Sequence, residues 1–191
     1  MVTTMQTDTF TASHQRRVAD LADAIAKEMG LTAERIRGIR IAALIHDVGK
    51  MYVPMEILRK PSKLTEVEME MMKHHPQAGH AIADRVECPW PVAEIVLQHH
   101  ERMDGSGYPQ GLAAEEILLE ARILGVADVV EAMASDRPYR PAHSLEEALG
   151  EVVHHRGALY DPDVVDACVR LFKTERSELP LWRIGVEAGC S

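Results

Sequence analysis

Residues 42–50 read AALIHDVGK, an apolar run that ends in two polar residues, His46 and Asp47. Upstream, Ile36 and Ile39 extend the apolar run at the three- to four-residue spacing of a helix. The glycine and the proline at positions 49 and 54 end such a helix. The pattern therefore predicts a helix that leads directly into a neutral nitrogen ligand and an anionic oxygen ligand on neighbouring residues.

A second polar stretch lies downstream, at residues 99–112, which read HHERMDGSGYPQGL. Its three glycines and one proline predict a loop, and His99 with His100 adds two nitrogen ligands. Nitrogen combined with carboxylate oxygen suits iron, manganese or zinc, whereas calcium and magnesium prefer shells made only of oxygen. The two stretches together indicate a transition-metal site.

Helical signals recur along the chain, and the alternation typical of strands is almost absent. The pairs Thr65 with Glu68 and Ser144 with Glu147 match the capping box that begins a helix. Aromatic residues make up only 4% of the chain, so the core must rest on Ala, Leu, Ile, Val and Met, a set that favours helices. The predicted fold class is all-α, with about seven helices. Further helix boundaries are predicted near Gly30, Thr32, Lys73, His75, Val92, Ala121, Ala134 and Asp161.

The composition is that of an ordinary globular chain of 191 residues, with a formal net charge of −9. This charge argues against binding to long nucleic acid, which needs a basic surface, but a local metal site can still hold a small anion. Cys88, Cys168 and Cys190 are scattered and odd in number, which predicts free thiols in a reducing cytoplasm. No signal peptide and no apolar run near the roughly 20 residues of a membrane span is found. We expect a soluble cytoplasmic domain without direct membrane insertion, although a membrane-bound parent protein stays open.

The stretches 42–50, 99–112 and 121–140 occur in the order found in the HD-GYP family, and the chain resembles this branch of the HD-domain metal-dependent phosphohydrolases. The resemblance covers roughly residues 8–175. It implies an HD-domain helical bundle with an HD-GYP loop extension, and it places the domain at residues 10–176 between tails at 1–9 and 177–191. It also implies that the protein is a cyclic di-GMP phosphodiesterase.

The resemblance assigns the metal ligands by local motif. A Glu that some family members use as a ligand, four residues before the first histidine, is here Phe10, so we expect two metals rather than three. Iron and manganese fit the ligand set equally well, and Asp47 is the expected bridge. Two cations about 3.5–4 Å apart can clamp a phosphodiester and lower the pKa of a bridging water. The implied ligands are His14, His46, Asp47, His75, His99, His100 and Asp128.

The family also places Lys50 beside the scissile phosphate, as a catalytic residue together with Asp47. If the helix continues that far, Lys50 and His46 project from one face; the alternative is an ordinary cationic helix end. The signature loop with Gly107, Tyr108 and Pro109 is expected beside the substrate.

Arg137 and Arg140 match family positions around substrate phosphates, which suits guanidinium geometry, while a surface salt bridge is the alternative. Asp128 could instead be a helix carboxylate with a local partner. His74, the neighbour of His75, is expected to be a bystander. The remaining histidines match no ligand position and are expected on the surface: His80, His143, His154 and His155.

The predicted reaction is hydrolysis of cyclic di-GMP to linear pGpG, with further hydrolysis to GMP left open and 3′,3′-cyclic GMP-AMP as a related substrate. Two alternatives remain: an HD-type phosphohydrolase of another nucleotide, and a domain that senses nucleotide or docks a partner without turnover. The partners implied are a sensor or receiver domain or a diguanylate cyclase.

Overall fold

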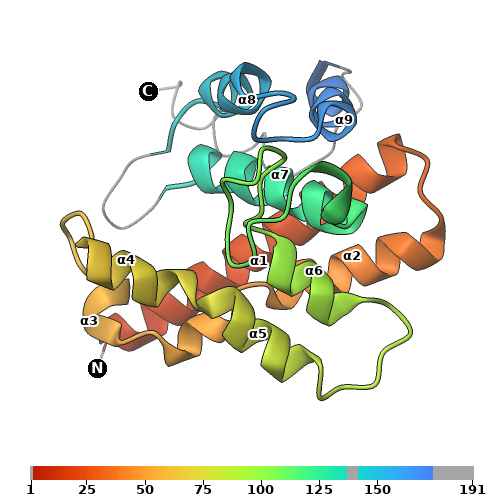
Figure 1. Cartoon of the computed structure of the whole chain (residues 1–191). Helices are drawn as coiled ribbons and strands as arrows, with labels where there is room; N and C mark the ends of the chain where they lie inside the picture. Colours follow the sequence, from red (N-terminus) through yellow and green to blue (C-terminus); the bar gives the residue numbers. More distant parts are fainter. Residues whose placement is uncertain (1, 137–141, 174–191) are drawn as a thin grey trace.

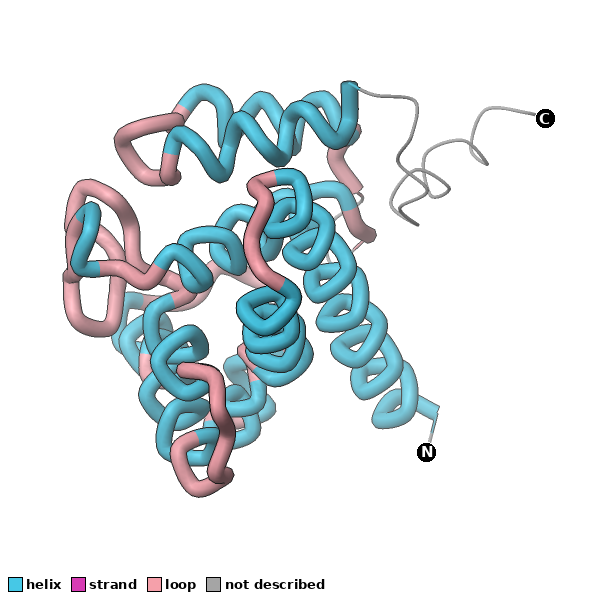
Figure 2. Tube along the Cα trace, turned by 90° about the vertical axis from the view of Figure 1, so that its right-hand side faces the viewer, coloured by secondary structure: helices cyan, strands magenta, loops and turns pink. Residues whose placement is uncertain are grey.

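The computed structural model describes residues 2–136 and 142–173, with side chains from residue 12 onwards. The described residues form helices joined by loops, and their only strand-like pairing is two isolated bridges (Figure 2). This confirms the predicted all-α class. The helices are α1 (Val2–Glu28), α2 (Ala33–Ile45), η1 (a 3₁₀ helix, Val48–Tyr52), α3 (Met55–Leu58), α4 (Glu66–Lys73), α5 (His75–Ala83), α6 (Val92–Gln98), η2 (a 3₁₀ helix, Ala114–Glu116), α7 (Leu119–Ala134), α8 (Leu145–His154) and α9 (Pro162–Lys173).

Helix α7 runs through the middle of the molecule and packs against α1, α2, α6, α8 and α9 (Figure 1). Helices α1 and α2 lie on one side of it, α5 and α6 pair with each other below, and α8 with α9 forms a separate layer above. This central position explains why α7 is apolar nearly all round, since a helix with neighbours on every side has no solvent face. The largest fully buried apolar side chains include Ile123 and Leu124 of α7 and, from the helices around it, Leu21, Ile25, Ile39 and Ile95.

The predicted caps form as expected. Thr32 accepts the backbone N–H of Arg35 at 3.4 Å and begins α2, and both capping boxes, at Thr65 and at Ser144, are complete. Asp161 accepts the backbone N–H of Asp163 at 2.8 Å, so it caps α9. Each cap satisfies an N–H group that the first turn of a helix leaves without a partner.

Three elements differ from the sequence expectation. Helix α1 begins at Val2, so it includes residues assigned to a tail, while the domain limits themselves stay a prediction. The structure has nine α-helices in its described residues rather than about seven, in part because α3 is a single turn that no apolar repeat marks.

The third difference concerns Lys50. Helix α2 ends at Ile45, and the chain continues into η1, so Lys50 and His46 do not share a helix. The condition for one common helical face, a helix that continues to Lys50, is therefore not met. The tighter 3₁₀ turn brings residues three apart onto one side, and this places Lys50 over Asp47.

Candidate metal centre

All seven sequence-predicted ligands converge in one buried region, delivered by five helices. His14 lies within α1, His46 and Asp47 follow α2, and His75 is the first residue of α5. His99 and His100 follow α6, and Asp128 lies within α7. Ligand atoms fall within 4.8 Å of one another in three sets: His14, His46 and Asp128; His46, Asp47 and His99; and His75, His99 and His100.

Three of the histidines are held by the same local contact. The Nδ1 atoms of His46, His75 and His99 lie 2.7, 2.8 and 2.6 Å from the carbonyl oxygens three residues earlier in the chain. An Nδ1–H that donates to a carbonyl fixes the tautomer and leaves Nε2 as a lone-pair donor. The helix ends therefore supply both the histidines and the acceptors that aim them at the centre.

Asp47 and Asp128 connect the histidines. Asp128 Oδ1 lies 3.3 Å from His14 Nε2 and 3.8 Å from His46 Nε2. Asp47 Oδ2 lies 3.6 Å from His46 Nε2, and its Oδ1 lies 3.5 Å from His75 Nε2. The two oxygens of Asp47 thus face opposite sets of histidines, the arrangement that a bridging carboxylate needs.

The electrostatics keep most ligands in the metal-binding form. Burial lowers the pKa of His99 to about 3, and it also lowers the pKa of His75 and of His100, so these rings are neutral at pH 7. Burial opposes ionisation of Asp47, but the nearby positive charge, chiefly that of Lys50, outweighs it and holds the pKa of this carboxyl below its usual range. Neutral imidazole and ionised carboxylate are the forms that ligate divalent cations.

His14 is the exception. Burial disfavours its cation, but hydrogen bonds to Asp128 and Glu131 outweigh burial and raise the pKa of His14 to about 9. A metal ion that binds His14 Nε2 must therefore displace a proton, so metal binding at this histidine depends on pH.

Two buried polar atoms test whether these residues fit a metal. His46 Nε2 and Asp47 Oδ1 are inaccessible to solvent and have no hydrogen-bond partner among the described residues. A buried polar group without a partner costs about 1–3 kcal/mol, so such atoms are rare unless they serve another purpose. An imidazole nitrogen and a carboxylate oxygen, both buried without a partner among the clustered histidines and carboxylates, have the chemistry of divalent-metal ligands, and we conclude that the residues fit a metal.

Lys50 lies directly beside this centre. Its Nζ is 2.7 Å from Asp47 Oδ2, and about a third of its side chain (36%) is exposed. The cation therefore faces the ligand set on one side and solvent on the other. That is the position in which a charge can meet an incoming anion.

The glycine-rich loop reaches the centre through Tyr108, whose ring stacks on His100 with centroids 4.8 Å apart. Lys73, from α4, lies over the same ring, with Nζ 5.8 Å from its centroid. Burial raises the pKa of Tyr108, so its hydroxyl stays protonated at neutral pH. Pro109 follows Tyr108 through a cis peptide bond.

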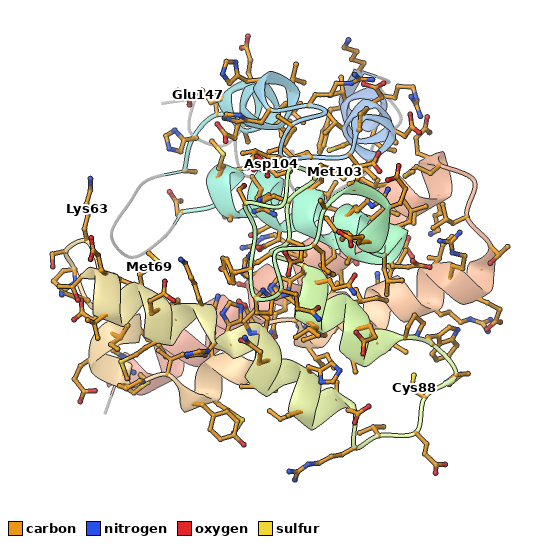
Figure 3. The ribbon with its side chains drawn as sticks, in the orientation of Figure 1. Lys63, Met69, Cys88, Met103, Asp104 and Glu147 are labelled. Atoms are coloured by element: carbon orange, nitrogen blue, oxygen red, sulfur yellow. The ribbon has the colours of Figure 1, made fainter. Side chains whose placement is uncertain are left out.

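Glu101 holds the loop in place from beneath. Its buried carboxylate accepts the backbone N–H groups of Gln110 at 2.7 Å and of Leu112 at 3.0 Å. A Cβ atom on Gly107 would lie 2.4 Å from the Glu101 Cα, so only glycine lets the loop approach this closely. Asp104, labelled in Figure 3, tightens the outer turn by accepting the N–H of Ser106 at 2.9 Å.

Three residues of this region were missed by sequence reasoning. Glu131 contacts the ligand His14, Glu101 supports the loop, and Lys73 lies over Tyr108. The one available signal was a glutamate within the apolar α7, since an isolated buried carboxylate requires a partner.

The remaining predictions divide into two kinds. Arg137 and Arg140 lie outside the described residues, as does the side chain of Phe10. The other histidines lie away from the ligand sets; His80 pairs with Glu94 at 3.0 Å, for example, and His154 is exposed.

Comparison with known proteins identifies the fold and the family. A model of the HD domain matches residues 5–164. The chain is 45% identical to "Cyclic di-GMP phosphodiesterase response regulator RpfG" of Xanthomonas campestris pv. campestris, over 85% of this chain and 44% of that protein. It is 40% identical to "3′3′-cGAMP-specific phosphodiesterase 1" of Vibrio cholerae, over 84% of this chain and 38% of that protein.

Among solved structures, Bd1817, an HD-GYP-type protein of Bdellovibrio bacteriovorus, superimposes with a TM-score of 0.70 at 20% identity, over 86% of this chain and 53% of that one. The chain thus spans less than half the length of the two named relatives. No helix among the described residues is long and apolar enough to cross a bilayer.

Proposed function

The chain belongs to the HD-GYP family of HD-domain proteins, and we propose that it is a metal-dependent phosphodiesterase that hydrolyses cyclic di-GMP to pGpG. The observation that carries this proposal is the position of Asp47. Its two carboxylate oxygens face different histidines, and Lys50 contacts one of these oxygens, Oδ2. A binding domain without turnover would need no such cation beside a ligand shell.

The distances support a site for two divalent metals. His14, His46 and Asp128 would hold one cation, His75, His99 and His100 the other, and Asp47 would lie between them. Two cations so placed supply Lewis-acid charge on a phosphodiester and an activated water. Iron or manganese is the proposed identity, because a shell of five histidines and two carboxylates suits both.

The chain's own residues bind and orient the substrate. Lys50 offers positive charge where the phosphate becomes more negative in the transition state, which is the interaction that accelerates a reaction. Tyr108 stacks on the candidate ligand His100 and so places the signature loop at the edge of the centre, beside the proposed substrate. We assign the second phosphate of the cyclic dinucleotide to Arg137 and Arg140, on the strength of their sequence motif.

We also propose a cytoplasmic location and a partner domain for this chain. Cys88 and Cys168 are free thiols, which supports a cytoplasmic location. The relative from Xanthomonas is named a response regulator, which supports a receiver or other sensor domain as a partner. A relative named for cyclic GMP-AMP keeps that dinucleotide as the second candidate substrate.

A turnover assay tests the proposal. Protein purified anaerobically and loaded with Fe²⁺ or Mn²⁺ is incubated with cyclic di-GMP, and the products are separated by chromatography. We expect pGpG, and no product from His46→Ala or Asp47→Ala protein. Binding of cyclic di-GMP without product would favour the sensing domain instead. Hydrolysis of other nucleotides but not of cyclic dinucleotides would favour a different HD-type phosphohydrolase.

A further inference from the structure

Glu131 is a fully buried carboxylate of α7, one turn after the ligand Asp128. One of its oxygens contacts Nδ1 of His14 in α1, 117 residues away in sequence. The other oxygen accepts Arg17 Nε at 2.5 Å and Ser135 Oγ at 2.6 Å. This carboxylate thus joins α1 to α7 at the edge of the metal centre without belonging to any ligand set.

His14 needs such a partner because of its place in the fold. His46, His75 and His99 lie at or beside helix ends, where their Nδ1 atoms reach backbone carbonyls three residues earlier. His14 lies in the interior of α1, where the preceding carbonyls are already used by the helix. A side chain from another element must therefore accept its Nδ1–H, and Glu131 is the residue that does so.

We propose that Glu131 is a positioning residue for the metal centre, which holds the His14 ring so that Nε2 faces Asp128. The inference rests on the proposed function only in that the centre binds divalent cations. A carboxylate is required rather than an amide, because all three contacting groups are donors: His14 Nδ1–H, Arg17 Nε–H and Ser135 O–H. An amide at this position would turn its own N–H₂ group toward at least one of them.

The substitution Glu131→Gln tests this requirement with little change in volume. Turned toward His14, its N–H₂ group would donate to Nδ1 and move the ring proton to Nε2, where it blocks ligation. Turned away, it would meet the guanidinium of Arg17. Partners that orient a metal-bound histidine typically contribute about 10–100-fold to metal affinity. We therefore expect one of the two Mn²⁺ sites to weaken by about 10-fold or more.

Glu120→Gln is the matched control. Glu120 is a second buried glutamate of α7 with an arginine partner, Arg35 Nε at 2.7 Å, but it contacts no ligand. Both variants and the wild type are titrated with Mn²⁺ by equilibrium dialysis, after circular dichroism has shown that each is folded. Glu120→Gln should keep both sites at wild-type affinity.

A third comparison asks whether Glu131 acts through His14. In a His14→Ala background, Glu131→Gln should cause no further loss of Mn²⁺ affinity, because the group it positions is gone. Additive losses would overturn the proposal, as would equal affinities of Glu131→Gln and wild-type protein or equal losses in the two glutamine variants. These Mn²⁺ titrations do not depend on turnover. If they give the expected pattern but the turnover assay shows no hydrolysis, the proposed function is refuted and the role of Glu131 is not. Wild-type protein that binds no Mn²⁺ would refute both.

Discussion

Single residues of the metal centre show how burial and charge are balanced. A buried ionisable group is costly unless it is neutral or paired. Asp47 is paired with Lys50 and Asp128 with His14, whereas His99 is buried against other histidines and stays neutral. Acid should therefore destabilise the metal-free centre at both kinds of group, because the lowered pKa values of Asp47 and His99 mean that the unfolded chain binds more protons than the folded chain.

The pH dependence of stability should reveal the neutral histidines. Burial lowers the folded pKa of His99 to about 3, against about 6.5 in the unfolded chain. Between these values the unfolded chain binds a proton that the folded chain does not. This histidine should therefore lower the free energy of unfolding of metal-free protein by up to about 1.4 kcal/mol for each pH unit of acidification.

Urea denaturation of metal-free protein between about pH 4.5 and 6.5 measures this slope. His99→Gln should make it shallower by about the same 1.4 kcal/mol per pH unit. The control is His154→Gln, at an exposed position outside the centre, which should keep the wild-type slope. An unchanged slope in His99→Gln protein would mean that His99 is protonated in the folded state.

Lys50 should contribute to rate more than to metal binding. Its Nζ contacts Asp47, but Lys50 belongs to no ligand set. We expect Lys50→Ala to retain its metals and to lose kcat by about 10²-fold or more, as for a single lost transition-state donor. Lys60→Ala is the control and should be fully active, because it breaks a comparable ion pair, with Glu68, between residues that belong to no ligand set. Loss of metal from Lys50→Ala would show that this lysine instead holds Asp47 in place.

Arg137 and Arg140 should contribute to substrate affinity. Binding a phosphate that is not cleaved is the same in ground and transition states, so its loss raises KM more than it lowers kcat. The Arg137→Ala, Arg140→Ala double variant should bind cyclic di-GMP more weakly and keep its metals. It should lose less activity on a small phosphodiester that lacks a second phosphate. Equal losses on both substrates would mean that the arginines are structural.

At the scale of elements, close backbone contact aligns the ligands. A Cβ atom on Gly49 would lie 2.0 Å from the His75 carbonyl oxygen and 2.6 Å from the Gly79 nitrogen, so η1 lies directly on α5. The two elements carry Lys50 and His75, and Asp47 lies immediately before η1. Gly49 is therefore needed for packing rather than for a turn.

Gly49→Ala should separate these elements. The new methyl group meets backbone atoms that cannot rotate away, so we expect a loss of stability of about 1–3 kcal/mol, typical of overpacking, together with weaker Mn²⁺ binding. Gly150→Ala in α8, where a Cβ would have nothing within 4 Å, is the control. It should stabilise the protein by about 0.5–1 kcal/mol. Thermal denaturation of both variants measures the change in stability, and Mn²⁺ titration measures the change in metal affinity. Normal metal affinity in Gly49→Ala protein would refute the role given to the contact between η1 and α5.

On the scale of the whole molecule, local signals were predictable and long-range partners were not. The caps at Thr32, Thr65 and Ser144 depend on residues three positions apart, which a sequence displays directly. The seven candidate ligands could be picked out because their motifs are short and specific, and the fold brings them together. Glu131 could not be assigned, because its partner His14 is 117 residues away and only packing of α1 on α7 joins them. The end of α2 at Ile45 was also missed, since no residue before Gly49 forbids a longer helix.

Metal removal should therefore destabilise the molecule as a whole. The ligands come from α1, α2, α5, α6 and α7, so bound cations join elements that lie far apart in the chain. A ligand at about 100 times its Kd stabilises the folded state by about 2.7 kcal/mol, which for a chain of this size is roughly 5–10 °C in Tm for each metal. Differential scanning calorimetry with Mn²⁺, before and after addition of a chelator, measures the shift. In Asp47→Ala protein, which lacks the proposed bridge, the chelator should change Tm far less. A full shift in that variant would mean that the stabilising cations bind elsewhere, and the two-metal centre would have to be abandoned.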